Sequence, residues 1–293
     1  MSKKHPTKNQ HFVPQEHFRG FSQDGVMIYE YNIKNSEPIK TPVTIESICR
    51  EKYLYEVRGN SGEIIGMNYI EKNLCAVEGL FAERRRLIMR KARKENFHIR
   101  CFLSKEEKEF WYFYTTLQIM RNPLILNGAK TIIQDSFPQQ FTSNAENNIA
   151  LAYCLPFTPA DENRPNAFLS ILSMLLSKKI SVGFADCDRL FTSDITVYGY
   201  APNGLPDFDY LWFPISTSLV LIFSDPKLID RTKYNRLIPL SAKEVNEINK
   251  GISYIANQMI LSKYPFRAAE IRMIEKVRND RMQDEAPVLA TES

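Results

Sequence analysis

The longest predicted helix covers residues 68–94. Its apolar side chains at Ile70, Leu74, Val77 and Phe81 recur every three or four positions, which is the spacing of one helix face. Glutamates stand early in this segment and arginines late, as the helix dipole favours. We therefore expect a long amphipathic helix that buries one stripe of side chains.

Two further helices are marked by capping boxes, in which a serine and a glutamate three residues later satisfy each other's backbone amides. The box at residues 104–107 precedes an apolar run that ends before Pro123, so it predicts a helix over residues 105–122. The box at residues 241–244 predicts a helix that continues to Met259 and packs its apolar stripe on a sheet.

Shorter runs of β-branched and aromatic residues predict strands, first at residues 26–33 and 52–57. A helical segment follows at residues 167–176. Five runs punctuated by Asp, Gly and Pro then predict an antiparallel sheet, at residues 180–184, 190–192, 196–200, 210–215 and 219–224.

Two segments rich in amides or prolines, residues 137–148 and 158–165, predict loops, and the boundary between two lobes is expected between them. Residues 1–140 would hold an N-terminal β-rich segment plus long helices, and residues 150–280 an antiparallel sheet with flanking helices. Apolar periodicity is lost from residue 278 on, and residues 281–293 are expected to form a disordered tail. The predicted fold class is α+β, a helical bundle lobe packed with a small N-terminal β-rich segment and a C-terminal antiparallel sheet.

The composition indicates in which cellular compartment the protein is expected. The 293 residues are 44% hydrophobic and 25% charged, which is ordinary for a globular chain that buries a core without metals or disulfides. The 5 cysteines are scattered and form no C-x-x-C pair, so they favour a reducing compartment. The polar N-terminus lacks the apolar stretch of a secretory signal, and no run reaches the ~20 apolar residues of a membrane helix. We expect a cytoplasmic protein with no membrane association.

Seven segments together resemble a known family. They are QHFVP at residues 10–14, FRGFS at 18–22, IESICREKYLY at 45–55, LQIMRNP at 117–123, FTSD at 191–194, WFPIS at 212–216, and the pair Asn249 and Ala256. In this order they resemble the bacterial domain of unknown function 4238. The chain departs from the pattern at Ile195-Thr196, where the family has Asn-Pro, and at Thr217, where it has proline. The resemblance implies a mixed fold and a setting in mobile or phage-defence gene neighbourhoods, and it implies no reaction.

Four polar residues in or between these segments are candidates for catalysis: His11, Glu78, Arg121 and Asp194. An imidazole exchanges protons near neutral pH, and a guanidinium grips a phosphate through two parallel hydrogen bonds. Each has a structural alternative. His11 could bind backbone at the chain entry, and Arg121 could form a buried ion pair with Glu78 or Asp194. We expect His11 and Arg121 to converge on one cleft.

Glu78 and Asp194 are also candidate ligands for Mg²⁺ or Mn²⁺, because these cations prefer carboxylate oxygens. Asp194 could instead close a turn. Glu71, two helical turns before Glu78, is expected on a solvated face paired with Lys72 or Arg85. Secondary candidates are Gln118, Ser193 and Asn249.

The end of the first long helix is strongly basic. We expect its side chains to bind nucleic-acid phosphates if the protein binds nucleic acid: Arg84, Arg85, Arg86, Arg90, Lys91, Arg93 and Lys94. A solvated helix end is the alternative. The net charge of only +4 is far below that of a chain that coats nucleic acid.

Two functions follow as hypotheses. The first is a metal-dependent nuclease or phosphodiesterase of a mobile or phage-defence system, since no nucleotide-hydrolysis, dinucleotide or zinc-protease motif is present. The second is a non-catalytic nucleic-acid- or protein-binding module in which the polar motif residues are structural.

Overall fold

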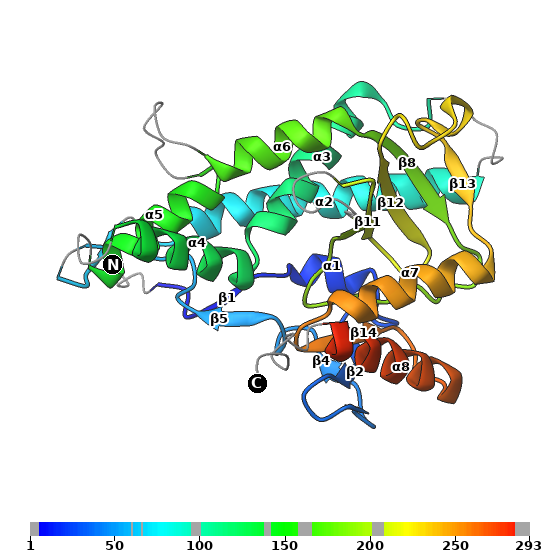
Figure 1. Ribbon diagram of the computed structural model, residues 1–293, viewed down its shortest axis with the longest axis horizontal. Coiled ribbons are helices and arrows are strands. Elements are labelled where there is room, and N and C mark those ends of the chain that lie inside the picture. Colours follow the sequence, from blue (N-terminus) through cyan, green and yellow to red (C-terminus); the bar gives the residue numbers. More distant parts are fainter. Residues whose placement is uncertain are drawn as a thin grey trace, which may run out of the picture.

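The computed structural model describes residues 6–59, 61–65, 67–94, 101–137, 142–157, 166–200 and 208–284. Figure 1 shows α4 and α5 at the left, α7 and α8 at the lower right and the long helix α2 running across the middle, with strands at the right and below the helices. The fold is α+β, as the sequence predicts. The helices are α1 (Gln15–Arg19), α2 (Tyr69–Lys94), α3 (Lys105–Met120), α4 (Pro123–Ser136), α5 (Ser143–Cys154), α6 (Ala167–Ser177), α7 (Ala242–Ile255) and α8 (Ala268–Asp284), and a 3-10 turn covers Arg231–Lys233.

The helix starts predicted from capping boxes are confirmed. The Ser104 hydroxyl accepts from the backbone amide of Glu107, and the Glu107 carboxylate accepts from the backbone amide of Ser104. Ser241 and Glu244 form the same pair of bonds at the start of α7. The bundle continues beyond Pro123, because the Asn122 side chain accepts from the Leu124 amide and lets α4 begin directly after α3.

The loop predicted at residues 137–148 is wrong over much of its length, because α5 begins at Ser143. The Thr142 side chain accepts from the Ala145 amide and starts the helix. Its buried residues Ala150, Leu151 and Cys154 belong to the core. The second predicted loop, residues 158–165, lies outside the described residues.

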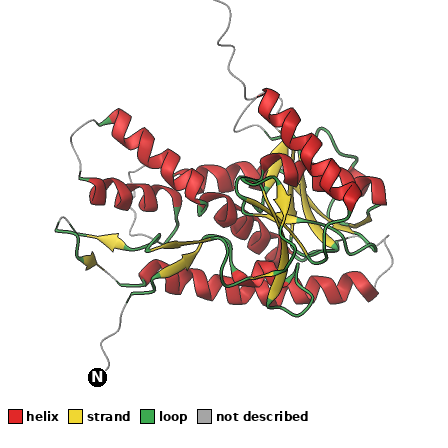
Figure 2. Cartoon of the chain, turned by 90° about the horizontal axis from the view of Figure 1, so that it is seen from below, coloured by secondary structure: helices red, strands yellow, loops and turns green. Residues whose placement is uncertain are grey.

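The larger sheet has the strand order β10-β11-β12-β8-β13. Its strands are β8 (Lys179–Phe184), β10 (Tyr198–Tyr200), β11 (Tyr210–Pro214), β12 (Leu219–Ser224) and β13 (Leu237–Pro239). The pairs are antiparallel except β13 with β8, which is parallel. Leu221 and Phe223 of β12 pack with the cluster that holds Phe81 and Trp111, whereas Val220 packs with the other cluster. The sheet therefore lies between α2 and α3 on one face and α7 on the other (Figure 2).

The smaller sheet joins strands that lie far apart in the sequence. Its strands are β2 (Met27–Asn32), β3 (Glu37–Pro38), β4 (Val43–Thr44), β9 (Thr192–Ser193) and β14 (Met259–Ser262). The order is β3-β2-β14-β9, with β4 also paired to β2. The segment at residues 190–192 thus leads into this sheet and not into the larger one. Met259 begins a strand, so the predicted continuation of the last capped helix to this residue is wrong.

Two short pairings complete the N-terminal part: β1 (Asn9–His11) with β5 (Arg50–Lys52), and β6 (Val57–Arg58) with β7 (Ile64–Ile65). The strand predicted at residues 52–57 is mostly a turn, because Tyr53 adopts a φ of 56°. At the other end, α8 extends through Asp284 into the predicted tail, and residues 285–293 lie outside the described residues. No helix in the described part of the chain has the length and apolar content to cross a bilayer.

Gly20 lets α1 dock onto the larger sheet. A Cβ at this position would lie 2.6 Å from the carbonyl oxygen of Ile215. The Gly20 carbonyl accepts from the Thr217 amide at 3.1 Å in the turn between β11 and β12. Only glycine permits this approach, which brings the segment at residues 18–22 against the one at residues 212–216.

Candidate functional site

Arg121 lies at the centre of the residues that the sequence nominates. It follows α3 directly, and only 1% of its surface is exposed. Its Nη1 donates to Oε1 of Glu78 at 2.7 Å, its Nη2 to the carbonyl of His11 at 2.6 Å, and its Nε to the Tyr55 hydroxyl at 3.3 Å. Burial works to lower the pKa of Arg121, but Tyr55 and Glu78 outweigh it and raise the pKa above its ordinary value. The guanidinium is a permanent charge, and each of its three nitrogens donates a hydrogen bond within the protein.

His11 meets Arg121 through its backbone and not through its ring. The imidazole Nε2 lies 3.1 Å from the Gln15 amide nitrogen, and Nδ1 is buried with no hydrogen-bond partner. Burial lowers the pKa of His11, the nearby backbone of Ile48 opposes this, and the charges of Arg50 and Arg121 lower it further. The ring is therefore neutral at physiological pH, and its contacts do not place it against Glu78.

Glu71 is not the solvated residue that the sequence suggests. Its Oε2 is buried without a partner, and burial raises the pKa of Glu71 to about 7 against the opposing charge of Arg121. Glu78 raises this pKa as well. The predicted pairing with Arg85 is wrong, because the Arg85 guanidinium lies 3.5 Å from the Glu16 carboxylate and donates to the His17 carbonyl at 3.3 Å.

Gln118 lies one turn before Arg121 on the same face of α3. It is buried, and neither its amide oxygen nor its amide nitrogen has a partner. Tyr114, one turn earlier, stacks on Phe81 of α2 at 4.4 Å between ring centroids, and its hydroxyl is unpartnered too. Polar groups thus line the interior seam between α2 and α3.

Asp194 is bound to backbone. Its carboxylate accepts from the amides of Asn257, Gln258 and Met259 at 3.1, 3.0 and 3.4 Å, and so holds the chain where α7 turns into β14. Burial raises the pKa of Asp194 although the three amides oppose the rise. The side-chain amide of Asn122 donates to the Asp194 carbonyl at 3.0 Å. Because Asn122 follows Arg121 directly, this bond connects Asp194 to the surroundings of Arg121.

The predicted metal ligands Glu78 and Asp194 have different partners, a guanidinium and three amides. Within the described segments, no group of three or more His, Cys, Asp and Glu side chains is placed to hold a metal ion. Ser193 closes the local turn, because its hydroxyl accepts from the Ile195 amide at 3.1 Å.

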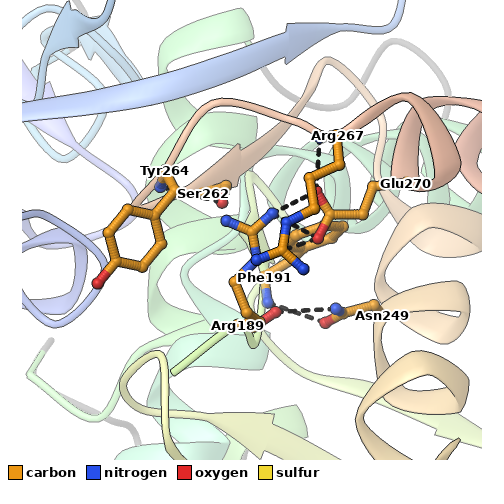
Figure 3. Close-up of polar contacts among 7 residues, drawn as sticks. All are labelled: Arg189, Phe191, Asn249, Ser262, Tyr264, Arg267 and Glu270. Carbon is orange, nitrogen blue, oxygen red and sulfur yellow. Dashed lines mark hydrogen bonds and ion pairs between the residues drawn. The ribbon is translucent and has the colours of Figure 1, made fainter. Parts of the chain in front are cut away.

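Asn249 binds the backbone of the segment that precedes β9. Its side chain accepts from the Phe191 amide and donates to the Arg189 carbonyl, each at 2.9 Å (Figure 3). The Arg189 guanidinium in turn binds Glu270 of α8, with Nη2 2.5 Å from Oε2 and Nε 3.1 Å from Oε1. The sequence nominated Asn249 but missed Arg189 and Glu270, which stand 81 positions apart and share no local pattern.

The basic end of α2 divides into two groups. Arg85 is buried, Lys91 donates to the Phe102 carbonyl, and Arg84 lies over the Phe110 ring at 5.7 Å, so these three pack against the protein. The other four are exposed, and among the described residues they have no ion-pair partner: Arg86, Arg90, Arg93 and Lys94. Phe97 and Arg100, which continue the basic segment in sequence, lie outside the described residues.

Comparison with protein-family models matches residues 9–264 to a family described as protein of unknown function (DUF4238). The match covers His11, Glu78, Arg121, Asp194 and Asn249. No curated protein and no solved structure matches the chain.

Proposed function

The chain belongs to the DUF4238 family, and from this premise we propose that it is a nucleic-acid-binding module whose buried motif residues maintain the fold. The exposed basic face of α2 would bind the phosphates. The phage-defence setting implied by the family resemblance would supply foreign nucleic acid as the target.

The exposed face of α2 carries the proposal. Arg86, Arg90, Arg93 and Lys94 fall within about 100° of the helix circumference at 100° per residue. From Arg86 to Arg93 the helix rises about 10 Å, which matches several successive phosphates of a nucleic-acid strand. Because no carboxylate in the described segments pairs with them, their charges are available to an external anion.

The contacts of the motif residues support the same proposal. The three donor groups of Arg121 end on Glu78, His11 and Tyr55, so an incoming phosphate would have to break buried bonds. Asp194 is similarly occupied by backbone amides. A metal-dependent nuclease would need these carboxylates free for Mg²⁺ or Mn²⁺, and we therefore favour binding over cleavage.

The test is binding of fluorescent RNA, single-stranded DNA and duplex DNA over a series of salt concentrations. In the variant Arg86→Gln, Arg90→Gln, Arg93→Gln and Lys94→Gln, affinity should fall at least tenfold. The slope of log K against log salt should shrink by about 0.7 to 0.9 for each phosphate that the variant no longer neutralises.

A matched control removes four exposed cations elsewhere, Lys34, Lys40, Arg272 and Lys276, and should leave the salt slope unchanged. If both variants lost affinity equally, the effect would come from net charge alone, and the proposal that the α2 face binds nucleic acid would be rejected. Cleavage of any substrate with Mg²⁺ or Mn²⁺ that disappears in Glu78→Gln would overturn the proposal in favour of a nuclease.

A further inference from the structure

An open pocket of 490 Å³ lies beside the N-terminal end of α8, and none of its lining residues belongs to α2. It is lined by Cys187, Arg189, Tyr264, Pro265 and Arg267. Two of these five residues carry permanent positive charge. Its volume falls in the range of pockets that hold small molecules.

Arg189 is held rigidly with one edge unused. Its side chain is only 10% exposed, and Nε and Nη2 bind the Glu270 carboxylate. The guanidinium carbon also lies 5.4 Å from the centre of the Tyr264 ring. Its remaining nitrogen, Nη1, donates to no residue in the described part of the chain, so two N–H groups stay available in a fixed position.

Arg267 supplies a second, uncommitted charge. Its backbone amide donates to Oε2 of Glu270 at 2.8 Å, which fixes the start of α8 (Figure 3). Its exposed guanidinium has no ion-pair partner among the described residues. Glu270 balances only one of the two arginines, and the nearby Lys263 is paired with Asp188 at 2.5 Å. The pocket therefore keeps an excess positive charge.

We propose that this pocket binds the phosphate group of a small phosphorylated ligand, between Nη1 of Arg189 and the guanidinium of Arg267. A phosphate has enough acceptor oxygens to bond to both arginines at once, and the N-terminal end of α8 adds a favourable dipole. The two oxygens of a carboxylate would match one guanidinium better than two. The remaining volume accommodates the organic part of the ligand.

The probe is inorganic phosphate. Its binding is measured by calorimetry and by thermal melting, with chloride added to samples without phosphate so that the ionic strength is the same. The wild-type chain should bind phosphate and melt at a higher temperature in its presence. Arg267→Gln should weaken phosphate binding at least tenfold while the melting temperature without phosphate stays the same. Arg272→Gln, an exposed arginine farther along α8, is the matched control and should bind as the wild type does.

Phosphate binding that is the same in Arg267→Gln as in the wild type would overturn the proposal, as would acetate binding equal to phosphate. Absence of any response in the wild type would also overturn it. The fourfold glutamine variant of α2 should keep its phosphate response, so failure of this site and failure of the nucleic-acid surface are distinguishable.

Discussion

Nη2 of Arg121 donates to the backbone carbonyl of His11 at 2.6 Å, across 110 positions of sequence. This bond joins the end of α3 to β1, the first described strand. Because the acceptor belongs to the main chain, the contact survives any substitution of the imidazole. Arg121 therefore contacts the main chain of His11 and not its imidazole, and convergence of the two side chains on one cleft stays a prediction.

Arg121→Lys should destabilise the protein. Lysine keeps the charge beside Glu78 but cannot also reach the His11 carbonyl and the Tyr55 hydroxyl. The free energy of unfolding should fall by about 3 kcal/mol, measured by urea denaturation. The exposed Arg93→Lys should change it by less than about 0.5 kcal/mol. A folded Arg121→Lys variant of unchanged stability would show that the network contributes little.

Asp194→Asn should weaken the junction between α7 and β14. One amide oxygen replaces two carboxylate oxygens that accept three backbone bonds, and the expected cost is about 1–3 kcal/mol. Asp186→Asn, at an exposed site, is the control. Mn²⁺ should leave the melting temperature of the wild type unchanged. A rise with Mn²⁺ that is lost in Asp194→Asn would restore this carboxylate as a metal ligand.

Glu71 should make stability fall as pH rises from about 4.5 to about 7. Its pKa is about 7 in the folded protein, against an ordinary value of 4.5, so the folded chain binds more protons in this window. Glu71→Gln mimics the protonated form. Below pH 4.5 the variant and the wild type should differ little in their free energy of unfolding. Above neutral pH the free energy of unfolding of the variant should exceed that of the wild type by about 1–2 kcal/mol more than it does in acid, after a discount for partial exposure.

The measurement for Glu71 is urea unfolding at several pH values. The exposed Glu83→Gln should follow the wild-type pH dependence. Parallel curves for the wild type and Glu71→Gln would contradict a raised pKa in the folded state.

His17 should remain neutral well below neutral pH. Burial, followed by the charge of Arg85, lowers its pKa from 6.5 to about 3, and its Nε2 lies 2.7 Å from the Thr192 hydroxyl. The unfolded chain binds the proton first, so this residue costs stability as pH falls below 6.5, by about 1.4 kcal/mol per pH unit. Imidazole NMR shifts of His17 should stay constant down to about pH 5. A titration midpoint near 6.5 would show that the ring is accessible to solvent.

Local signals account for the elements that the sequence predicts well. The capping boxes at Ser104 and Ser241 and the apolar stripe of α2 act within a few residues, so they are visible in one sequence. By contrast, α5 is amide-rich and depends on its cap at Thr142 and on packing of Leu151 into the core. Formation of α5 therefore depends on tertiary contacts, which cannot be read from the sequence of this segment alone.

The site divides along the same line. Helical spacing places Arg85 on the buried stripe four positions after Phe81, so its removal from the basic face could have been predicted. The partners of Arg121 and Asp194 could not, because backbone carbonyls and amides occur at every position and carry no sequence signal. The pairing of Arg189 with Glu270 needs the fold to bring β9 and α8 together.

The position of β14 between β2 and β9 has a consequence for synthesis. Tyr29 of β2 pairs with Ser262, so the central partner of β2 is translated only after all of the chain from α2 to α7. At about 5–20 residues per second, β2 waits tens of seconds on the ribosome with one edge exposed. Such long-range pairing slows folding, and an exposed strand edge is open to wrong partners. Ribosome-bound chains that end before Met259 should therefore be more readily bound by chaperones than chains that extend past Ser262.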